Sequence, residues 1–424
     1  MASIFSGWSW KTVSGAIANV LEWYDFAIYG ILAVTIAPLF FPSDDPVTGL
    51  LATFGVFAAG FMMRPLGGLV LGHVADKLGR STALTLSVAL MAVPTTLIAI
   101  LPTYATIGIA APLILTLTRL LQGLSVGGAY TGSVTYLVEN APRGQRGLSG
   151  CWSLVGSIVG LLLGSMVVAL VTSLLTPEQL ASWGWRLPFA TGILLAFLGV
   201  YLRWHSEDAE VEWEDPHAPK EPDMPIVDAV TNHGYDMLRV VGVNILNGVG
   251  FYIPFVYLTT YLVEYNELPQ RYALDINTGT LVVLIFLIPV FAYLSDRYGR
   301  RPFMLAGATG MVLLSYPFFW LLHHPSYTMV ILGQLGFAVV MACFLGGLPA
   351  AMAEMFPRQV RMTAYSVAFN IPIALFGGTT PLVATYLIGY THYDLAPAFY
   401  AMAAALVAFG TILTMRETFR SPLR

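Results

Sequence analysis

The chain has 424 residues, of which 57% are hydrophobic and 10% charged, and its formal net charge is −4. Soluble domains carry about 25% charged residues, so this chain lacks the polar side chains that would cover its surface in water. The composition therefore excludes a soluble enzyme, a disordered protein and a nucleic-acid binder, and it favours a polytopic helical membrane protein.

Apolar stretches recur along the chain, and each is long enough for a helix to cross the hydrocarbon core, which takes about 20 residues. We predict an all-α polytopic membrane protein with twelve transmembrane helices in two pseudo-symmetric six-helix bundles. An even number of spans places both termini on one side of the membrane. In chain order the predicted spans are 15–40, 49–73, 82–101, 107–138, 147–172, 186–204, 236–265, 274–294, 302–322, 327–355, 361–390 and 394–416.

The distribution of positive charge predicts the orientation of these spans. With both termini in the cytoplasm, all but four of the 20 lysines and arginines fall on the cytoplasmic side. Arg186 and Arg271 fall outside, and Arg64 and Arg119 lie within spans. Because short cytoplasmic loops carry an excess of Lys and Arg, we expect both termini in the cytoplasm.

The two halves of the chain repeat one another. Residues 72–81 read GHVADKLGRS and residues 292–301 read AYLSDRYGRR, so an Asp-x-x-Gly-Arg pattern recurs 220 positions later. The runs ENAPRGQR at 139–146 and EMFPRQVR at 354–361 also align. Such a duplication, with a site between the halves, is typical of secondary transporters. We predict six-helix bundles at residues 1–204 and 236–424, joined by a polar cytoplasmic linker at 205–235.

Several motifs resemble known transporters. The repeated Asp-x-x-Gly-Arg pattern and RLLQG at 119–123 resemble the major facilitator superfamily. Within it, NVLEWYDFAIYG at 19–30, FMMRPLGG at 61–68 and EMFPRQVRMTAYSVAFNI at 354–371 resemble the metabolite:proton symporter family, and most of all its proline/glycine betaine symporters. The resemblance implies proton-driven import across a bacterial inner membrane. The chain departs from the family at Ala129, where Glu is usual, and it ends without the C-terminal coiled coil of the osmosensing members, so osmotic control by that device is not expected.

Charged side chains inside apolar spans predict a proton-coupling site, because each costs about 3 kcal/mol or more at the centre of a helix. Glu22 and Asp25 lie three residues apart on one helix face, and two such carboxylates resist ionising together. Arg119 in the fourth span is the natural partner. A carboxylate whose pKa depends on whether this arginine is engaged by substrate supplies what proton coupling needs. The alternatives are a permanent structural pair of Asp25 with Arg119, and a gating role for Glu22.

Polar and aromatic side chains predict the substrate site. The spans of the second half offer amides in place of charges, so we expect the first half to hold the proton machinery and the second half to bind substrate through hydrogen bonds and rings. A ring attracts a quaternary ammonium by about 0.5–2 kcal/mol, although core packing explains most aromatic residues in membrane proteins. The candidate substrate-binding residues are Asn19, Tyr29, Arg119, Gln122, Tyr130, Trp152, Asn244, Asn247 and Asn370.

Charged residues at the predicted cytoplasmic ends of the spans predict a gate. Their carboxylates can bond to arginines and to helix N-termini, and so hold the two halves together on one side of the membrane. The alternative is that these positive charges only determine the topology. The candidate gate residues at these ends are Asp76, Arg80, Glu139, Arg146, Asp296, Arg300, Glu354 and Arg361. Arg64, which lies within the second predicted span before Pro65, is a further candidate, with a structural or a gate-forming role.

Together these patterns predict a transporter and no enzymatic activity. We expect a monomeric proton-coupled symporter in the lipid bilayer of a bacterial inner membrane, importing a carboxylate-bearing metabolite by alternating access. The substrate is either a zwitterion such as proline or glycine betaine, or an organic acid. The coupling ion is the proton, with no cofactor, no metal and no nucleic-acid partner. The alternatives are a proton-driven antiporter that exports organic compounds and a transporter-like sensor.

Overall fold

The computed structural model describes residues 10–68, 70–71, 80–193 and 225–423. In this part of the chain the secondary structure is helical, with no β-strand. Nine helices of the described part are long and apolar enough to cross a membrane, and a bent pair makes a tenth if it is counted as one span. The third predicted span corresponds to Arg80–Ile100, and the sixth begins within 184–193. The prediction of an all-α polytopic fold is confirmed.

Two predicted spans of the first half are broken helices. α1 and α2 meet at an angle of 69°, and two glycines lie in the segment 126–128 that separates α7 from α8. Neither a bend nor a short non-helical turn changes the hydropathy of a span, so the apolar stretches alone do not indicate these interruptions. The helices are α1 (Trp10–Ile31), α2 (Ala33–Phe40), α3 (Pro46–Met62), α5 (Arg80–Ile100), α6 (Tyr104–Ile107), α7 (Ala110–Ser125), α8 (Ala129–Glu139), α9 (Arg146–Leu174), α10 (Pro177–Ser182) and η1 (Gly184–Arg186).

Two spans of the second half contain a π-helical turn beside a proline. Pro254 lies within η3, and Pro372 directly precedes η4. A proline has no N–H to donate to the preceding turn, so the local helix widens; the side chain of Gln334 donates to the carbonyl of Pro254. The helices are α12 (Pro225–Tyr252), η3 (Ile253–Tyr257), α13 (Leu258–Glu264), α14 (Gln270–Tyr298), α15 (Arg300–Leu322), α16 (Tyr327–Glu354), α17 (Arg358–Pro372), η4 (Ile373–Gly377), α18 (Thr380–Thr391) and α19 (Ala396–Thr414).

α12 begins earlier than the hydropathy pattern suggests. The predicted span begins at 236, whereas the helix begins at Pro225 and has Asp228 in its first turn. A proline near a helix start and an acidic side chain in the first turn are both favourable there. The polar residues 225–235 are therefore helical, and residues 205–224 lie outside the described part of the chain.

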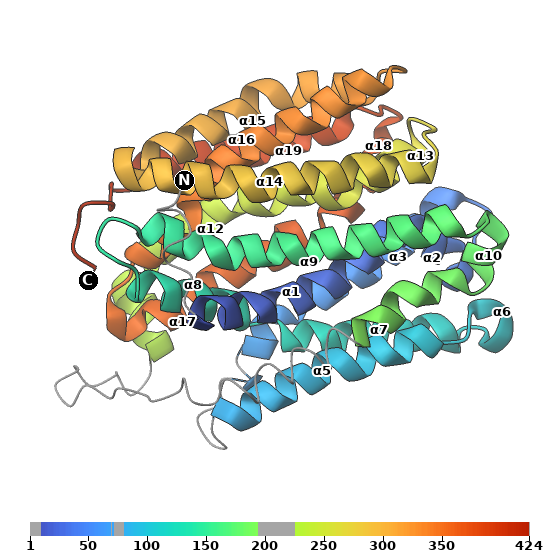
Figure 1. Ribbon diagram of the computed structural model, residues 1–424, viewed down its shortest axis with the longest axis horizontal. Coiled ribbons are helices and arrows are strands. Elements are labelled where there is room, and N and C mark those ends of the chain that lie inside the picture. Colours follow the sequence, from blue (N-terminus) through green and yellow to red (C-terminus); the bar gives the residue numbers. More distant parts are fainter. Residues whose placement is uncertain (1–9, 69, 72–79, 194–224, 424) are drawn as a thin grey trace.

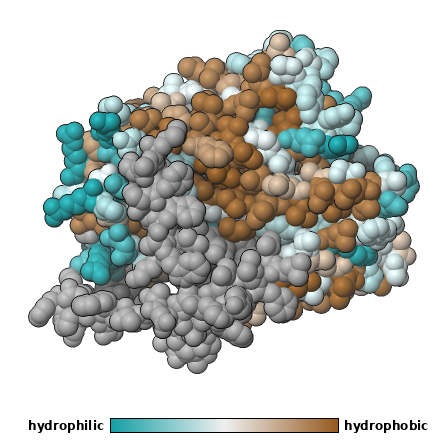
Figure 2. Space-filling view, in the orientation of Figure 1, coloured by the Kyte–Doolittle hydropathy of each residue, from teal (hydrophilic) through white to brown (hydrophobic). Residues whose placement is uncertain are grey.

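The long helices lie side by side, with the start of α1 and the C-terminal residues at the same end of the molecule (Figure 1). α6, α10 and the connection from α13 to α14 lie at the opposite end. Figure 2 shows hydrophobic side chains in a broad band between more hydrophilic ends. Large apolar side chains such as Ile100, Phe286 and Leu313 are more than 65% exposed. This band matches a surface that faces lipid.

A close helix crossing fixes the position of α1. A Cβ atom on Gly160 of α9 would lie 2.4 Å from the carbonyl oxygen of Val20 and 3.0 Å from Cβ of Trp23. Only a residue without a side chain allows these two backbones to approach so closely. The crossing holds the middle of α1, with Trp23 and Asp25, inside the first half.

Candidate functional site

A buried ion pair lies inside the first half. The guanidinium of Arg119 on α7 donates from Nη1 to Oδ2 of Asp25 on α1 at 2.7 Å, and the two side chains are 0% and 3% exposed. Sequence reasoning proposed these two residues as partners, and the structure brings them together. In such a dry setting, removing one partner of an ion pair costs about 3–5 kcal/mol, because the other charge is left uncompensated.

A short chain of hydrogen bonds extends from this pair to α5 and back to α7. The hydroxyl of Thr95 on α5 donates to Oδ1 of Asp25 at 2.8 Å, and Nε2 of Gln122 on α7 donates to Oγ1 of Thr95 at 2.8 Å. The carbonyl of Met91 lies 2.8 Å from the same hydroxyl. A hydroxyl has one hydrogen, so Thr95 donates either to Asp25 or to Met91 at any moment. Thr95 can therefore change its donor direction when Asp25 gains a proton.

Aromatic rings surround the guanidinium of Arg119. Its Cζ atom lies 4.3 Å from the ring centre of Tyr29 and 5.7 Å from that of Phe189. The hydroxyl of Tyr29 donates to the carbonyl of Thr53 at 3.0 Å, which fixes the ring. The cation is thus held by one carboxylate and by π faces, and its Nε and Nη2 have no hydrogen-bond partner among the described residues.

Asn19 and Glu22 lie on the same helix as Asp25 but interact with different residues of the first half. The amide of Asn19 donates to Oγ of Ser153 on α9 at 2.9 Å. Glu22 is 6% exposed and interacts electrostatically with Arg64. The two acidic residues of α1 therefore have different cationic neighbours: Asp25 has Arg119, and Glu22 has Arg64.

The candidate substrate-binding amides of the second half make hydrogen bonds within the protein. Asn244 donates to the carbonyl of Val240 at 2.8 Å, and Asn247 donates to Oδ1 of Asn244 at 2.9 Å. Asn370 on α17 donates to the carbonyl of Gly127 at 2.6 Å, so it joins the two halves. None of these three amides joins the hydrogen-bonded chain of Asp25 among the described residues.

The other two aromatic candidates of the first half are Tyr130 and Trp152. Tyr130 stacks on Phe369 of the second half, with ring centres 4.8 Å apart and an interplanar angle of 20°, and it interacts electrostatically with Arg64. Trp152 is half-buried and packs against the core. The charged neighbour of Tyr130 is therefore Arg64.

Five aromatic side chains from both halves form a cluster, here called the ring cluster. Trp23 lies 6.0 Å from both Phe251 and Tyr252 between ring centres, and Phe61 lies 5.4 Å from Tyr252. Phe57 lies 4.9 Å from Phe61 and 6.4 Å from Tyr252. α1 and α3 of the first half thus meet α12 of the second half through π faces and edges.

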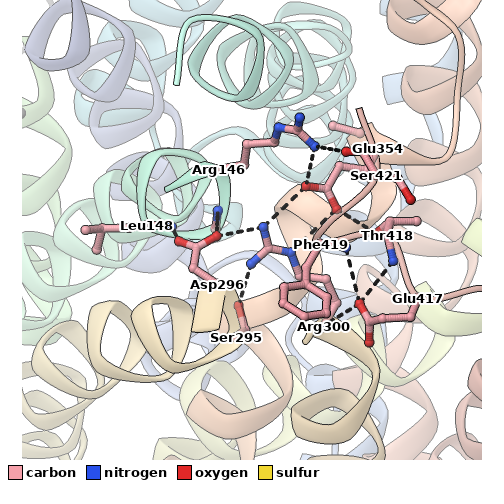
Figure 3. Close-up of polar contacts among 12 residues, drawn as sticks. Arg146, Leu148, Ser295, Asp296, Arg300, Glu354, Glu417, Thr418, Phe419 and Ser421 are labelled. Atoms are coloured by element: carbon pink, nitrogen blue, oxygen red, sulfur yellow. Dashed lines mark hydrogen bonds and ion pairs between the residues drawn. The ribbon is translucent and has the colours of Figure 1, made fainter. Parts of the chain in front are cut away.

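Charged residues connect the two halves at the end of the molecule that carries the C-terminal residues, here called the network end (Figure 3). Asp296 of α14 accepts hydrogen bonds from the backbone N–H groups of Gly147 and Leu148, each at 2.8 Å. These groups belong to the first turn of α9, where the helix dipole also favours a negative charge. Asp296 pairs with Arg300 at 2.7 Å as well.

Two further ion pairs cross between the halves at the network end. Arg146 of α9 lies 3.4 Å from Glu354 of α16, which also pairs with Arg300 at 3.3 Å. Arg361 of α17 pairs with Glu139 of α8. Sequence reasoning proposed all of these residues for a gate, and the structure places them in contact across the two halves.

Of the other gate candidates, Asp76 lies outside the described residues, and Arg80 is described only as the first residue of α5. Arg64 takes part in none of the ion pairs of the described network; its guanidinium carbon lies 5.2 Å from the ring centre of Phe61 and 6.0 Å from that of Trp23. It therefore lies beside the ring cluster.

The C-terminal segment joins the network end, which sequence reasoning did not predict. The carboxylate of Glu417 accepts from the backbone N–H groups of Arg300 and Arg301 at 2.9 Å each. Thr418 donates to Glu354 at 2.6 Å, and Arg146 donates to the carbonyl of Ser421 at 3.0 Å (Figure 3). The network end is therefore closed by both halves and by the tail.

Comparison with known proteins places this geometry in a family. The family model described as "Sugar (and other) transporter" matches residues 11–209, and the model described as "Major Facilitator Superfamily" matches residues 240–423. A proline/betaine transporter of Salmonella typhimurium is 34% identical and covers 98% of this chain and 85% of its own length. The glycine betaine/proline/ectoine/pipecolic acid transporter OusA of Dickeya dadantii is 34% identical and covers 97% of this chain and 84% of its own length.

Solved structures show the same fold. The xylose transporter XylE of E. coli in a partially occluded inward-open conformation is 19% identical, with a TM-score of 0.72 over 100% of both chains. In its inward-open conformation it is 18% identical, with a TM-score of 0.76 over 97% of both chains. This likeness concerns the fold alone. The chain is a multi-pass membrane transporter and not an enzyme; it belongs to the major facilitator superfamily, among the relatives of the proline/betaine transporters.

Proposed function

We propose that this transporter imports a zwitterionic solute such as proline or glycine betaine together with protons. The observation that carries the proposal is the buried pair of Asp25 and Arg119, whose carboxylate is also bonded to Thr95. An ionisable pair inside a membrane span is costly and marks a functional site by default. The names of the relatives support the substrate class, and organic acids remain the second substrate class that the sequence favours.

Asp25 is the proposed proton carrier. A proton on its carboxyl group removes the charge that holds Arg119, and the new O–H donates a hydrogen bond to Thr95. Thr95 then donates to the carbonyl of Met91, which already lies 2.8 Å away. Asp25 and Thr95 both keep a hydrogen bond during this exchange. Protonation removes the negative charge of Asp25 and leaves the positive charge of Arg119 without its carboxylate partner.

The network end is the proposed cytoplasmic gate. Ion pairs connect α16 and α17 of the second half with α9 and α8 of the first half, and hydrogen bonds connect α14 with α9, so an opening at this end must break them. Alternating access then moves the two bundles against each other around a site near the middle of the membrane. The proposed setting is a monomer in a bacterial inner membrane with cytoplasmic termini, with the proton as coupling ion and no cofactor or metal.

Transport into proteoliposomes tests this proposal. The purified chain is reconstituted, and the uptake of labelled proline and glycine betaine is measured with the outside more acidic than the inside. The expected result is accumulation above the outside concentration, which collapses when a protonophore removes the gradient. Uptake that ignores the gradient would contradict proton coupling, and extrusion of solute driven by inward proton flow would favour the antiporter.

A further inference from the structure

Arg64 is a buried cation, and two of its donor nitrogens have no acceptor in the described part of the chain. Its side chain is 1% exposed, and its Nε and Nη2 atoms have no hydrogen-bond partner among the described residues. A buried donor without an acceptor costs about 1–3 kcal/mol, and more when the group is charged. Native proteins rarely retain such groups unless another molecule supplies the acceptor in some functional state.

Two more unused donors lie in the same place. Trp23 and Tyr252 belong to the ring cluster next to Arg64, and neither Nε1 of Trp23 nor the hydroxyl of Tyr252 has a hydrogen-bond partner among the described residues. Tyr252 also interacts electrostatically with Arg64. These N–H and O–H donors, together with the guanidinium of Arg64, fit a ligand that brings acceptor oxygens.

Nε and Nη2 of Arg119 also have no hydrogen-bond partner among the described residues, but the two arginines differ in their ion pairing. Arg119 has the carboxylate of Asp25 at 2.7 Å, so its charge is compensated inside the protein. The charged and titratable groups that act on Arg64 are Glu22, Tyr130 and Tyr252, and Arg64 has no ion pair within the described part of the chain. Of these two buried arginines, Arg64 has more capacity to bind a carboxylate from outside.

We propose that Arg64, together with Nε1 of Trp23 and the hydroxyl of Tyr252, binds the carboxylate of the transported zwitterion, and that the ring cluster receives its ammonium group. A guanidinium binds a carboxylate in a planar, two-pronged arrangement, and ring faces attract a quaternary ammonium. This inference rests on the proposed function, because it takes the zwitterionic substrate class as its ligand.

The position of this site explains how substrate would connect the halves. Trp23 and Arg64 belong to the first half, whereas Phe251 and Tyr252 belong to the second half. A ligand bound between them contacts both bundles, so it favours the state in which the bundles are closed around it. Asp25, the proposed proton carrier, pairs with Arg119 and not with Arg64, so substrate and proton occupy different sites.

The test compares a ligand that has the carboxylate with one that lacks it. Purified protein in nanodiscs is titrated with glycine betaine and with choline, and the ratio of the two dissociation constants is measured for each variant. Wild type is expected to prefer glycine betaine by about tenfold to a hundredfold, because a charged hydrogen-bonded contact is lost with choline. Arg64→Gln should reduce this preference to within about threefold, and Arg64→Lys should give an intermediate ratio.

Both dissociation constants are measured on the same variant, so a general loss of folded protein affects both titrations and does not change their ratio. The control Arg186→Gln, at a half-buried arginine outside this site, should keep the wild-type preference, and Arg119→Gln is measured as the competing carboxylate site. If Arg64→Gln keeps the preference and Arg119→Gln loses it, the carboxylate binds at Arg119 and this inference is wrong while the proposed function stands. If wild type binds neither glycine betaine nor proline, both the inference and the proposed substrate class are wrong.

Discussion

Replacing Asp296 with alanine should open the network end. The Asp296 carboxylate is 5% exposed, and it accepts two backbone N–H bonds at 2.8 Å and pairs with Arg300 at 2.7 Å. Removing one partner from such a buried set costs about 3–5 kcal/mol. Asp296 can keep its pair with Arg300 when the two halves separate, so part of this loss is common to the closed and the open state. We therefore expect the closed state to lose about 3 kcal/mol relative to the open state. This corresponds to a shift of about a hundredfold in the equilibrium.

The native thiol of Cys151 can report this opening. Cys151 is 0% exposed in α9, one turn after Gly147, and it interacts electrostatically with Asp296. In a Cys343→Ser background, the rate of alkylation by N-ethylmaleimide measures how often the thiol becomes accessible. We expect Asp296→Ala to raise this rate by about tenfold to a hundredfold, because the rate follows the population of the open state.

The matched control is Asp236→Ala. Asp236 also forms an ion pair at 2.7 Å, but with Arg239 in the same helix, and both side chains are partly exposed. Such a pair contributes about 0.3–0.5 kcal/mol, so the alkylation rate should match that of the background. An unchanged rate in Asp296→Ala, in protein that remains folded, would refute the assignment of Asp296 to a contact that closes this end.

Two further predictions concern the close crossing of α1 with α9 and the ion pair of Glu139 with Arg361. Gly160→Ala should lower the free energy of unfolding by about 1–3 kcal/mol, because the new Cβ would lie 2.4 Å from the backbone oxygen of Val20. Gly279→Ala, whose Cβ would meet nothing within 4 Å, should be neutral or stabilising by up to about 1 kcal/mol in the same thermal unfolding assay. A double-mutant cycle of Glu139→Gln with Arg361→Gln should give a coupling energy of about 0.5–3 kcal/mol, and additive effects would argue against this pair.

Much of the charged framework could be predicted from sequence. Asp25 and Arg119 both lie in apolar spans. An unpaired charge inside such a span is costly, so the pairing of these two opposite charges could be expected from the sequence. The gate residues repeat between the halves, so Asp296, Arg300 and Glu354 are marked by the duplication itself. These predictions depend on charge and on repeats, which a single sequence displays directly.

The remaining parts had no such signal. Thr95 is an ordinary threonine in an apolar span, and only the structure shows that its hydroxyl reaches Asp25. Phe57 and Phe61 are two of 24 phenylalanines, and two phenylalanines four residues apart also occur where a helix faces lipid. Arg64 precedes Pro65 within a predicted span, which suggested a structural or gate-forming role, yet the fold turns its side chain toward the ring cluster. These positions depend on how the helices cross.

The central claim is that Asp25 carries the coupling proton, and one pair of transport measurements on Asp25→Asn tests it most directly. Asparagine resembles the protonated carboxyl group and cannot release a proton. In proteoliposomes loaded with unlabelled glycine betaine, Asp25→Asn should still exchange it for labelled glycine betaine outside. In empty proteoliposomes under an inward proton gradient, it should equilibrate the label without accumulating it, whereas wild type and Asp236→Asn should accumulate it. Accumulation by Asp25→Asn at the wild-type level would contradict the account and make Glu22 the next candidate.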